Sequence, residues 1–360
     1  MALKAPSFSL VTADVVAGIL AADLTEAKDV VAEVYRRAAA GGGIVNPPSL
    51  FLRPDAAGPE RFIALPAALG EPRRAVGLKW IGSFPGNLDG GLPRASAVVV
   101  LNDPVTGYPV ACLEGAVISA TRTALSAVVG AEALTGGDPP VVVERLAVIG
   151  AGVISRRTVA AFSACSWRFG AVRVFDLRAE RAAGLAGEVA SAGVEASAVA
   201  SPAEAVDGAD LVIVATTATA PWFDDPALTR PGVTVLHLSL RDLTPETMAV
   251  ADHVVDDPTH AAREGTSLEL AIRHAGLDPA TVQPVGALLA GAATRDPDRP
   301  VIYSPFGLGS LDVALADLVL ARARERGLTI DVPDFFGAAL TGSPAEVWLD
   351  EPAGVPEAGR

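Results

Sequence analysis

Apolar residues in the first third of the chain follow a helical spacing and then an alternating one. Residues 10–40 carry apolar positions at helical spacing, and this run ends at three consecutive glycines, 41–43. Residues 44–115 predict mostly strands, and the polar turn at 102–107 separates two apolar runs, which indicates a hairpin. The helical pattern returns over residues 116–134.

The second part of the chain alternates short apolar runs with helical patterns, which is typical of a doubly wound parallel sheet. Strands are predicted near residues 145–149, 171–176, 210–215, 233–238 and 252–256. A last helical pattern over 311–324 is expected to return to the first part of the chain.

These patterns predict an α/β protein in which a Rossmann doubly wound parallel sheet is inserted into an α+β substrate-binding domain. We expect residues 1–127 and 312–350 to form the α+β domain, and residues 128–311 to form the nucleotide-binding domain. Residues 351–360 are rich in Pro, Gly and Glu, so a frayed tail is expected there.

A glycine turn follows the first strand of the alternating part. Gly150 and Gly152 stand between an apolar run and a helical pattern, and Asp176 ends the next apolar run. This layout is typical of a dinucleotide-binding βαβ unit, in which backbone N–H groups approach a pyrophosphate at a helix N-terminus. The alternative is an ordinary glycine turn with Asp176 as a solvated strand end.

Asp176 also bears on the choice of cofactor. A carboxylate at this position accepts hydrogen bonds from a ribose 2′-hydroxyl and repels a 2′-phosphate, so NAD is favoured over NADP. Arg178 and Arg181 follow closely, and either one could instead turn toward a phosphate.

Composition excludes several other classes of function. The 360 residues carry a formal net charge of −14 and no basic stripe, which argues against nucleic-acid binding. No apolar run approaches the roughly 18 residues of a membrane span, and no signal peptide is visible, so a soluble cytoplasmic protein is expected. The two cysteines and four scattered histidines indicate no metal site.

Three basic side chains lie in apolar or small-residue surroundings in the first domain. Lys79 is costly to bury there unless it is paired or functional, and the alternative is a strand-edge lysine that reaches solvent. Arg53 and Arg122 suit a bidentate carboxylate, and the alternative for each is a structural salt bridge.

Two further candidates come from the nucleotide-binding part. Asp242 closes the run 235–242, which is predicted to be a strand, so Asp242 is expected at the carboxyl edge of the sheet, where ligands bind. It could act as a base or orient water, or it could cap the next helix, in which case Thr244 competes with it. The glycine loop 304–309 could close over a nicotinamide or be a plain strand-to-helix turn.

Taken together, these stretches resemble the ornithine cyclodeaminase/μ-crystallin family over nearly the whole chain. The matching stretches are 77–82 around Lys79, the hairpin 101–109, 119–124, 150–152 and Asp242. The resemblance implies NAD-dependent chemistry on an amino acid and a homodimer built through strands of the first domain. Within the family, stretches 77–82, 237–243, 254–257 with His260, and 304–309 look like the branch that forms 2,3-diaminopropionate for siderophores and peptide antibiotics.

Matched motif by motif, the resemblance assigns a role to each candidate. Lys79 and Asp242 would be catalytic, Arg53 and Arg122 would bind substrate carboxylates, and Ser96 would place a hydroxyl near the substrate. The expected cofactor contacts are Gly150, Gly152, Val153, Ile154, Asp176, Arg178, Thr216, Ser304 and Gly307. Arg241 stands where ornithine cyclodeaminases carry a glycine, which argues against ornithine and would add positive charge for a substrate with three carboxylates.

The function expected from this branch is oxidative cleavage of N-(2-amino-2-carboxyethyl)-L-glutamate to 2-oxoglutarate and L-2,3-diaminopropionate. Either Lys79 or Asp242 could be the base. The alternatives are ornithine cyclodeamination, a ketimine or imino-acid reductase or alanine-type dehydrogenase, and a nucleotide-gated binding protein without turnover, as μ-crystallins can be.

Overall fold

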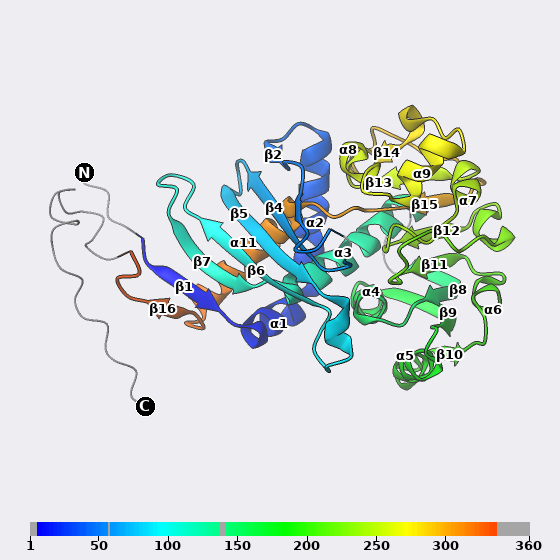
Figure 1. The fold of residues 1–360 in the computed structure, drawn as a ribbon, viewed down its shortest axis with the longest axis horizontal. Helices are drawn as coiled ribbons and strands as arrows, with labels where there is room; N and C mark the ends of the chain where they lie inside the picture. The colour runs from blue at the N-terminus through cyan, green and yellow to red at the C-terminus, as the bar shows by residue number, and fades with distance from the viewer. Residues whose placement is uncertain (1–5, 57, 137–140, 337–360) are drawn as a thin grey trace.

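The computed structural model describes residues 6–56, 58–136 and 141–336, which form two sheets connected by helices (Figure 1). Strands of the first sheet follow the order β16-β1-β7-β6-β5-β4-β2, with β3 paired to β4. All pairs in this sheet are antiparallel except β1 with β7. Their bounds are β1 Phe8–Val11, β2 Ile44–Val45, β3 Leu50–Leu52, β4 Arg61–Leu69, β5 Ala75–Ser83, β6 Ala95–Asn102, β7 Pro109–Glu114 and β16 Ile330–Val332.

The second sheet is parallel throughout and has the order β10-β9-β8-β11-β12-β15-β13-β14. The chain reverses its winding between β8 and β11, and the crevice at such a switch point is where open α/β sheets bind ligands. The bounds are β8 Val141–Ile149, β9 Trp167–Phe175, β10 Glu195–Ala198, β11 Leu211–Val214, β12 Thr234–His237, β13 Asp252–Val255, β14 Gln283–Pro284 and β15 Val301–Tyr303.

Helices cover both sheets, and α3 lies between them (Figure 1). Short 3₁₀ turns span Pro85–Leu88, Pro226–Thr229 and Pro279–Thr281. The helices are α1 Ala13–Ala22, α2 Leu24–Ala39, α3 Ala116–Thr135, α4 Val153–Ala164, α5 Ala179–Ser191, α6 Pro202–Val206, α7 Pro245–Ala249, α8 Pro258–Ala261, α9 Ser267–His274, α10 Val285–Leu289 and α11 Gly309–Glu325.

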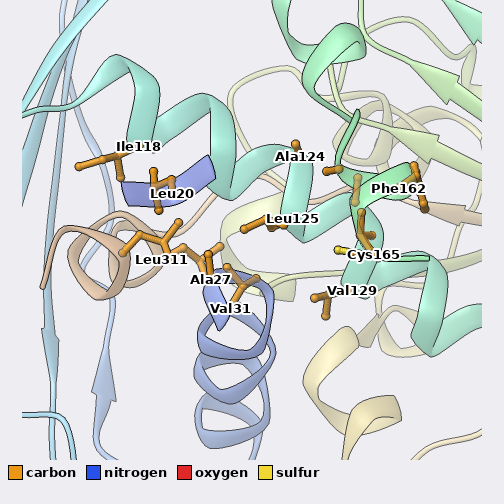
Figure 2. Close-up of a cluster of buried hydrophobic side chains, with 14 of the residues drawn as sticks. Leu20, Ala27, Val31, Ile118, Ala124, Leu125, Val129, Phe162, Cys165 and Leu311 are labelled. Atoms are coloured by element: carbon orange, nitrogen blue, oxygen red, sulfur yellow. The ribbon is translucent and has the colours of Figure 1, made fainter. Parts of the chain in front are cut away.

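The central core is built around α3. Figure 2 shows apolar side chains from α1, α2, α4 and α11 meeting those of α3, among them Leu20, Val31, Leu125, Phe162 and Leu311. α3 contacts β6 in the first sheet and β12 and β15 in the second. Because one buried helix packs on both sheets, side chains on its two faces can reach both halves of a site between them. By length and composition α3 is the one described helix that could cross a membrane, and most of it is buried inside the protein.

The predicted fold class is confirmed, and the differences concern individual elements. Residues 10–40 do not form one helix: β1 ends at Val11, and α1 and α2 are separated at Asp23, whose side chain accepts a hydrogen bond from Glu26 N at the start of α2. Strand β10 was not predicted because its residues Glu195–Ala198 include no large apolar or β-branched side chain, and β15 was not predicted because it has only three residues.

The last helix returns to the first sheet, as the sequence indicated. α11 begins at Gly309, contacts β4, β5 and β6, and is followed by β16 at the edge of the first sheet. The first sheet takes its strands from residues 8–114 and 330–332 and the second from residues 141–303, while α3 and α11 run across the expected boundaries at 127/128 and 311/312. The division into domains at these positions stays a prediction. The predicted frayed tail at 351–360 lies outside the described residues.

Candidate functional site

The turn after β8 has the geometry that a dinucleotide pyrophosphate requires. Gly150 has φ +89°, and a Cβ there would lie 2.5 Å from the carbonyl oxygen of Ala215, so only glycine fits. Gly152 is the N-cap of α4 and makes no side-chain cap, which leaves the N–H groups of the first turn, at Val153 and Ile154, available to an anion. Ser155 is buried and donates a hydrogen bond to the carbonyl oxygen of Gly150.

Asp176 stands beside this turn at the end of β9. Its carboxylate accepts hydrogen bonds from Ala151 N at 2.7 Å and from Arg178 N at 2.9 Å. The acid therefore orders the glycine turn as well as offering oxygens to a ribose. The uncapped helix start, the glycine turn and this carboxylate together fit NAD.

Asp242 lies at the carboxyl edge of the same sheet, in the loop after β12. The strand ends at His237, so the sequence expectation that the strand continued to Asp242 was wrong. Thr244, not Asp242, caps α7. The Asp242 carboxylate is fully buried and accepts hydrogen bonds from the hydroxyls of Thr216 and Ser239, and from Trp222 Nε1 at 3.1 Å.

His237 is the fourth neighbour of this carboxylate, with Nε2 3.3 Å from Asp242 Oδ2 and Nδ1 3.4 Å from Ser304 Oγ. Burial raises the pKa of Asp242, but the hydrogen bonds and charge of His237 and the hydroxyl donors outweigh it and lower the pKa to about 2. Asp242 is therefore a permanent anion that is fully engaged by its neighbours.

The loop 304–309 is held in place by a buried acid, Asp256, at the end of β13. Its carboxylate accepts hydrogen bonds from Phe306 N at 3.0 Å and Gly307 N at 2.6 Å. Gly307 has φ +99°, and a Cβ there would lie 2.5 Å from Nη1 of Arg122. The loop therefore needs glycine both for its backbone conformation and for the arginine that packs on it.

Lys79 and Arg122 share one buried carboxylate, that of Asp312 on α11. Lys79 Nζ lies 2.7 Å from Asp312 Oδ2, and Arg122 Nε lies 3.3 Å from Oδ1. Lys79 also donates to Ser119 Oγ at 3.0 Å. The side chains of Lys79 and Asp312 are 2% and 0% exposed, which excludes the interpretation of Lys79 as a solvent-reaching strand-edge residue.

Burial lowers the pKa of Lys79 to about 8, since desolvation outweighs the opposing charge of Asp312. Neutral amine is therefore present near neutral pH, as a general base requires. Asp312 was not singled out from the sequence. Its only signal there is a carboxylate in the first turn of the helix, between the apolar residues Leu311 and Val313.

The structure thus brings the candidates together in two groups. Lys79 and Arg122 meet at Asp312, while Asp242 and Thr216 meet beside His237. The loop 304–309 touches both groups, through Ser304 at one end and Gly307 at the other. Within the described part of the chain, no three His, Cys, Asp or Glu side chains are grouped to hold a metal ion.

Arg53 and Ser96 lie apart from these groups. Arg53 is partly exposed and pairs with Glu264 at 3.4 Å. Ser96 is exposed and lies opposite Gly82 in the β5–β6 ladder, whereas Lys79 lies opposite Val99. Because successive side chains of a strand point to opposite faces, Ser96 is on the other face of the sheet from Lys79. Its predicted contact with substrate stays a prediction.

Comparisons with known proteins show relatives over most of the chain. The model of the "Ornithine cyclodeaminase/mu-crystallin family" matches residues 10–327. N-((2S)-2-amino-2-carboxyethyl)-L-glutamate dehydrogenase of Staphylococcus aureus is 28% identical over 75% of this chain and 81% of its own. Alanine dehydrogenase of Archaeoglobus fulgidus is 27% identical over 85% and 92%. The structure of Thermococcus litoralis Delta(1)-pyrroline-2-carboxylate reductase with NADH and L-proline superimposes with a TM-score of 0.82 at 25% identity, over 90% of this chain and all of that one.

Proposed function

The chain belongs to the ornithine cyclodeaminase/mu-crystallin family, and from that premise we propose that it oxidatively cleaves N-(2-amino-2-carboxyethyl)-L-glutamate. At the coarser level it is an NAD-dependent oxidoreductase that acts on the carbon–nitrogen bond of an amino acid. The proposed products are 2-oxoglutarate and L-2,3-diaminopropionate, a building block for a siderophore or a peptide natural product. Support for this branch comes from the Staphylococcus aureus relative and from Arg241 directly before Asp242.

In the balanced reaction, substrate, NAD⁺ and water give 2-oxoglutarate, L-2,3-diaminopropionate, NADH and a proton. When bound, NAD⁺ accepts a hydride from the glutamate α-carbon. The glycine turn at Gly150 and Gly152 and the carboxylate of Asp176 would hold the cofactor. The loop 304–309, which contacts both groups of candidate residues, would border the reacting carbon.

The observation that carries the proposal is the buried lysine beside a buried arginine. The substrate amine must lose its proton before the carbon–nitrogen bond can be oxidised. With a pKa of about 8, roughly a tenth of Lys79 is neutral at pH 7 and can accept that proton. Arg122, on the same carboxylate, is placed to anchor the substrate carboxylate next to the reacting carbon.

Asp242 has a different proposed role. A carboxylate with a pKa of about 2 is a poor proton acceptor at neutral pH. Its fixed negative charge at the carboxyl edge of the sheet instead favours the cationic imine that loss of a hydride creates. Lys79 then releases the proton of the amine as the net proton of the reaction. When water adds to the imine carbon, Lys79 would take up the proton of that water and pass it to the nitrogen of the departing L-2,3-diaminopropionate.

Spectrophotometry with product analysis tests the proposal. The purified protein is mixed with NAD⁺ and synthetic N-(2-amino-2-carboxyethyl)-L-glutamate, with L-ornithine in a parallel reaction. We expect absorbance of NADH to rise together with 2-oxoglutarate and diaminopropionate, identified by mass spectrometry. Proline formed from ornithine without net NADH would overturn the proposal in favour of cyclodeamination.

A second candidate is an imino-acid reductase, favoured by the structural likeness to the Thermococcus litoralis enzyme. This candidate predicts oxidation of NADH with Delta(1)-pyrroline-2-carboxylate and no reaction with the glutamate derivative. The two candidates are therefore separated by the direction of the absorbance change and by the substrate that causes it.

The homodimer and the cytoplasmic location remain predictions. Support for a dimer comes from the face of the first sheet opposite Lys79, where Val76 and Val98 are 36% and 39% exposed and Phe62 stacks on Trp80 with ring centroids 5.3 Å apart. An exposed apolar sheet face of this kind is typical of a surface that packs against a partner.

A further inference from the structure

Two arginines flank the last residue pair at the end of the first sheet, and a third reaches the same edge. The last pair of β3 and β4 is Leu52 with Phe62; Arg53 follows Leu52, Arg61 precedes Phe62, and the charge of Arg53 acts on Arg61. Arg61 is in turn opposite Ser83 on β5, whose hydroxyl accepts a hydrogen bond from Arg94 at 2.8 Å. Side chains directly opposite each other are about 5 Å apart at Cβ, and like charges there destabilise a sheet.

A fourth arginine reaches this edge from the nucleotide-binding half. Arg241 donates from Nε and Nη2 to the backbone oxygen of Glu264 at 3.2 and 2.6 Å, and the Glu264 carboxylate pairs with Arg53. Across residues 6–56, 58–136 and 141–336, Arg61 makes no side-chain hydrogen bond and no ion pair within 4 Å. The charge of the Glu264 carboxylate thus acts on Arg53, Arg61 and Arg241, and the charge of Arg94 acts on Arg61. We call these four side chains the arginine cluster: Arg53, Arg61, Arg94 and Arg241.

The cluster is partly desolvated, which adds to its cost. Burial lowers the pKa of Arg61, and the charges of Arg241, Arg94 and Arg53 lower it further. The backbone that presents the cluster is also strained, because Leu240 and Glu264 have φ of +72° and +59°. Strain of this kind is concentrated where a ligand is bound. Repulsion, burial and strain together indicate a site that an anion completes.

The position of the cluster connects it to the reaction. Ser83 lies on the same face of β5 as Lys79 and four residues further along, which is about 13 Å at 3.3 Å per residue. Arg241 directly precedes Asp242. The cluster therefore lies along the same sheet face as Lys79, at a distance that a long arginine side chain and an extended substrate span together, and Arg241 connects it along the chain to Asp242.

We propose that the arginine cluster is an anion subsite for a substrate carboxylate remote from the reacting carbon, and that the Glu264 carboxylate occupies it in the free protein. This inference rests on the proposed function, which supplies a substrate with two such carboxylates. Glu264 competes with the substrate, and its displacement releases the Arg53–Glu264 ion pair that joins the two halves of the protein.

Kinetics with the holoenzyme tests the inference. Two substrate analogues each carry one remote carboxylate replaced by a carboxamide, and kcat and KM are measured for the acid and both amides. Wild type is expected to prefer the acid over at least one amide by about 10- to 100-fold in kcat/KM. Arg61→Gln should lose this preference because kcat/KM falls for the acid alone and stays unchanged for the amides. Glu264→Gln should lower KM for the acid by about 3- to 10-fold.

The control is Arg230→Gln, an exposed arginine that pairs with Asp210 in the nucleotide-binding half. It should leave the preference unchanged. The inference is overturned if wild type turns over acid and amides equally, or if Arg61→Gln slows all three by the same factor. A change in oligomeric state in Arg61→Gln, with the preference retained, would assign the cluster to a subunit interface and overturn it as well.

A binding measurement separates failure of the subsite from failure of the proposed reaction. If wild type does not turn over the substrate, calorimetry with propane-1,2,3-tricarboxylate and the protein–NAD⁺ complex still reports on the cluster. Binding that Arg61→Gln abolishes and Glu264→Gln strengthens would support the subsite without the reaction. Binding that is indifferent to both substitutions would overturn it.

Discussion

Replacement of Asp312 by asparagine removes the charge that Lys79 and Arg122 share while keeping the shape of the side chain. With an effective dielectric constant of about 20, the contacts of 2.7 and 3.3 Å correspond to gross Coulomb energies of about 6 and 5 kcal/mol. Desolvation of the three groups offsets much of this. Breaking a buried pair from one side typically costs about 3–5 kcal/mol, because the partner charge stays buried, and we expect that loss here.

Urea unfolding followed by tryptophan fluorescence measures this loss. For m-values of about 2.5–3 kcal/mol/M, the unfolding midpoint should fall by about 1–2 M. The matched control is Asp317→Asn on the same helix, where the carboxylate is 37% exposed and pairs with Arg73 at 3.0 Å. A surface pair of this kind contributes at most about 1 kcal/mol.

The pH dependence provides a second readout. Asp312 raises the pKa of Lys79 against the stronger effect of burial, so its removal should lower that pKa below 8 by about one unit or more. Since the neutral amine is the active form, kcat/KM of wild type should rise with pH to a plateau above about 8. In Asp312→Asn this rise should move to lower pH.

The sign of the stability effect follows from the same shift. A lysine whose pKa is lower in the folded state than in the unfolded state makes the fold less stable as pH falls, because the unfolded chain binds more protons. The destabilisation by Asp312→Asn should therefore be larger at pH 6 than at pH 9. The reasoning is refuted if Asp312→Asn unfolds within 1 kcal/mol of wild type and keeps the same pH profile.

Three further predictions test the nucleotide turn, the cofactor preference and the subunit contact. Gly150→Ala should abolish NAD⁺ binding and lower the thermal midpoint because a Cβ meets a carbonyl oxygen at 2.5 Å, whereas Gly187→Ala, with nothing within 4 Å, should be neutral or stabilising in both measurements. Asp176→Asn should raise KM for NAD⁺ about tenfold and narrow the preference over NADP⁺ in steady-state assays; an unchanged ratio would contradict the assignment of this acid. Val98→Asp should convert a dimer to monomer in light scattering, while Val142→Asp, at an exposed position near the start of β8 in the other sheet, should not.

Residues close together in the sequence were the ones that could be identified from it. The glycine turn at Gly150 and the acid at Asp176 belong to one strand–helix–strand unit, so their spacing alone fixes how they meet. Lys79 was identified because a charged residue in an apolar strand is costly to bury. Each of these signals is local, and none requires knowledge of how distant elements pack.

Asp312 and the arginine cluster could not be found in this way. Asp312 reaches Lys79 only because α11 returns to β5 after the whole nucleotide-binding half has been inserted between them. Arg61 and Arg94 precede their strands or begin them, where arginine is an ordinary surface residue. These arginines come close to one another only through the strand register, which a single sequence does not fix.

From the sequence, either Lys79 or Asp242 could be the base. In the structure their surroundings give the two groups different pKa values. Lys79 has one carboxylate partner in a desolvated position, and its pKa falls to about 8. Asp242 receives hydrogen bonds from two hydroxyls and an indole and lies against His237, and its pKa falls to about 2. Two ionisable groups with such different pKa values are suited to different roles. Lys79 is suited to proton transfer, and Asp242 is suited to stabilising a positive charge. A base must change its charge near neutral pH, and of these two only Lys79 does so. Asp242 is therefore the group whose charge stays constant through the reaction.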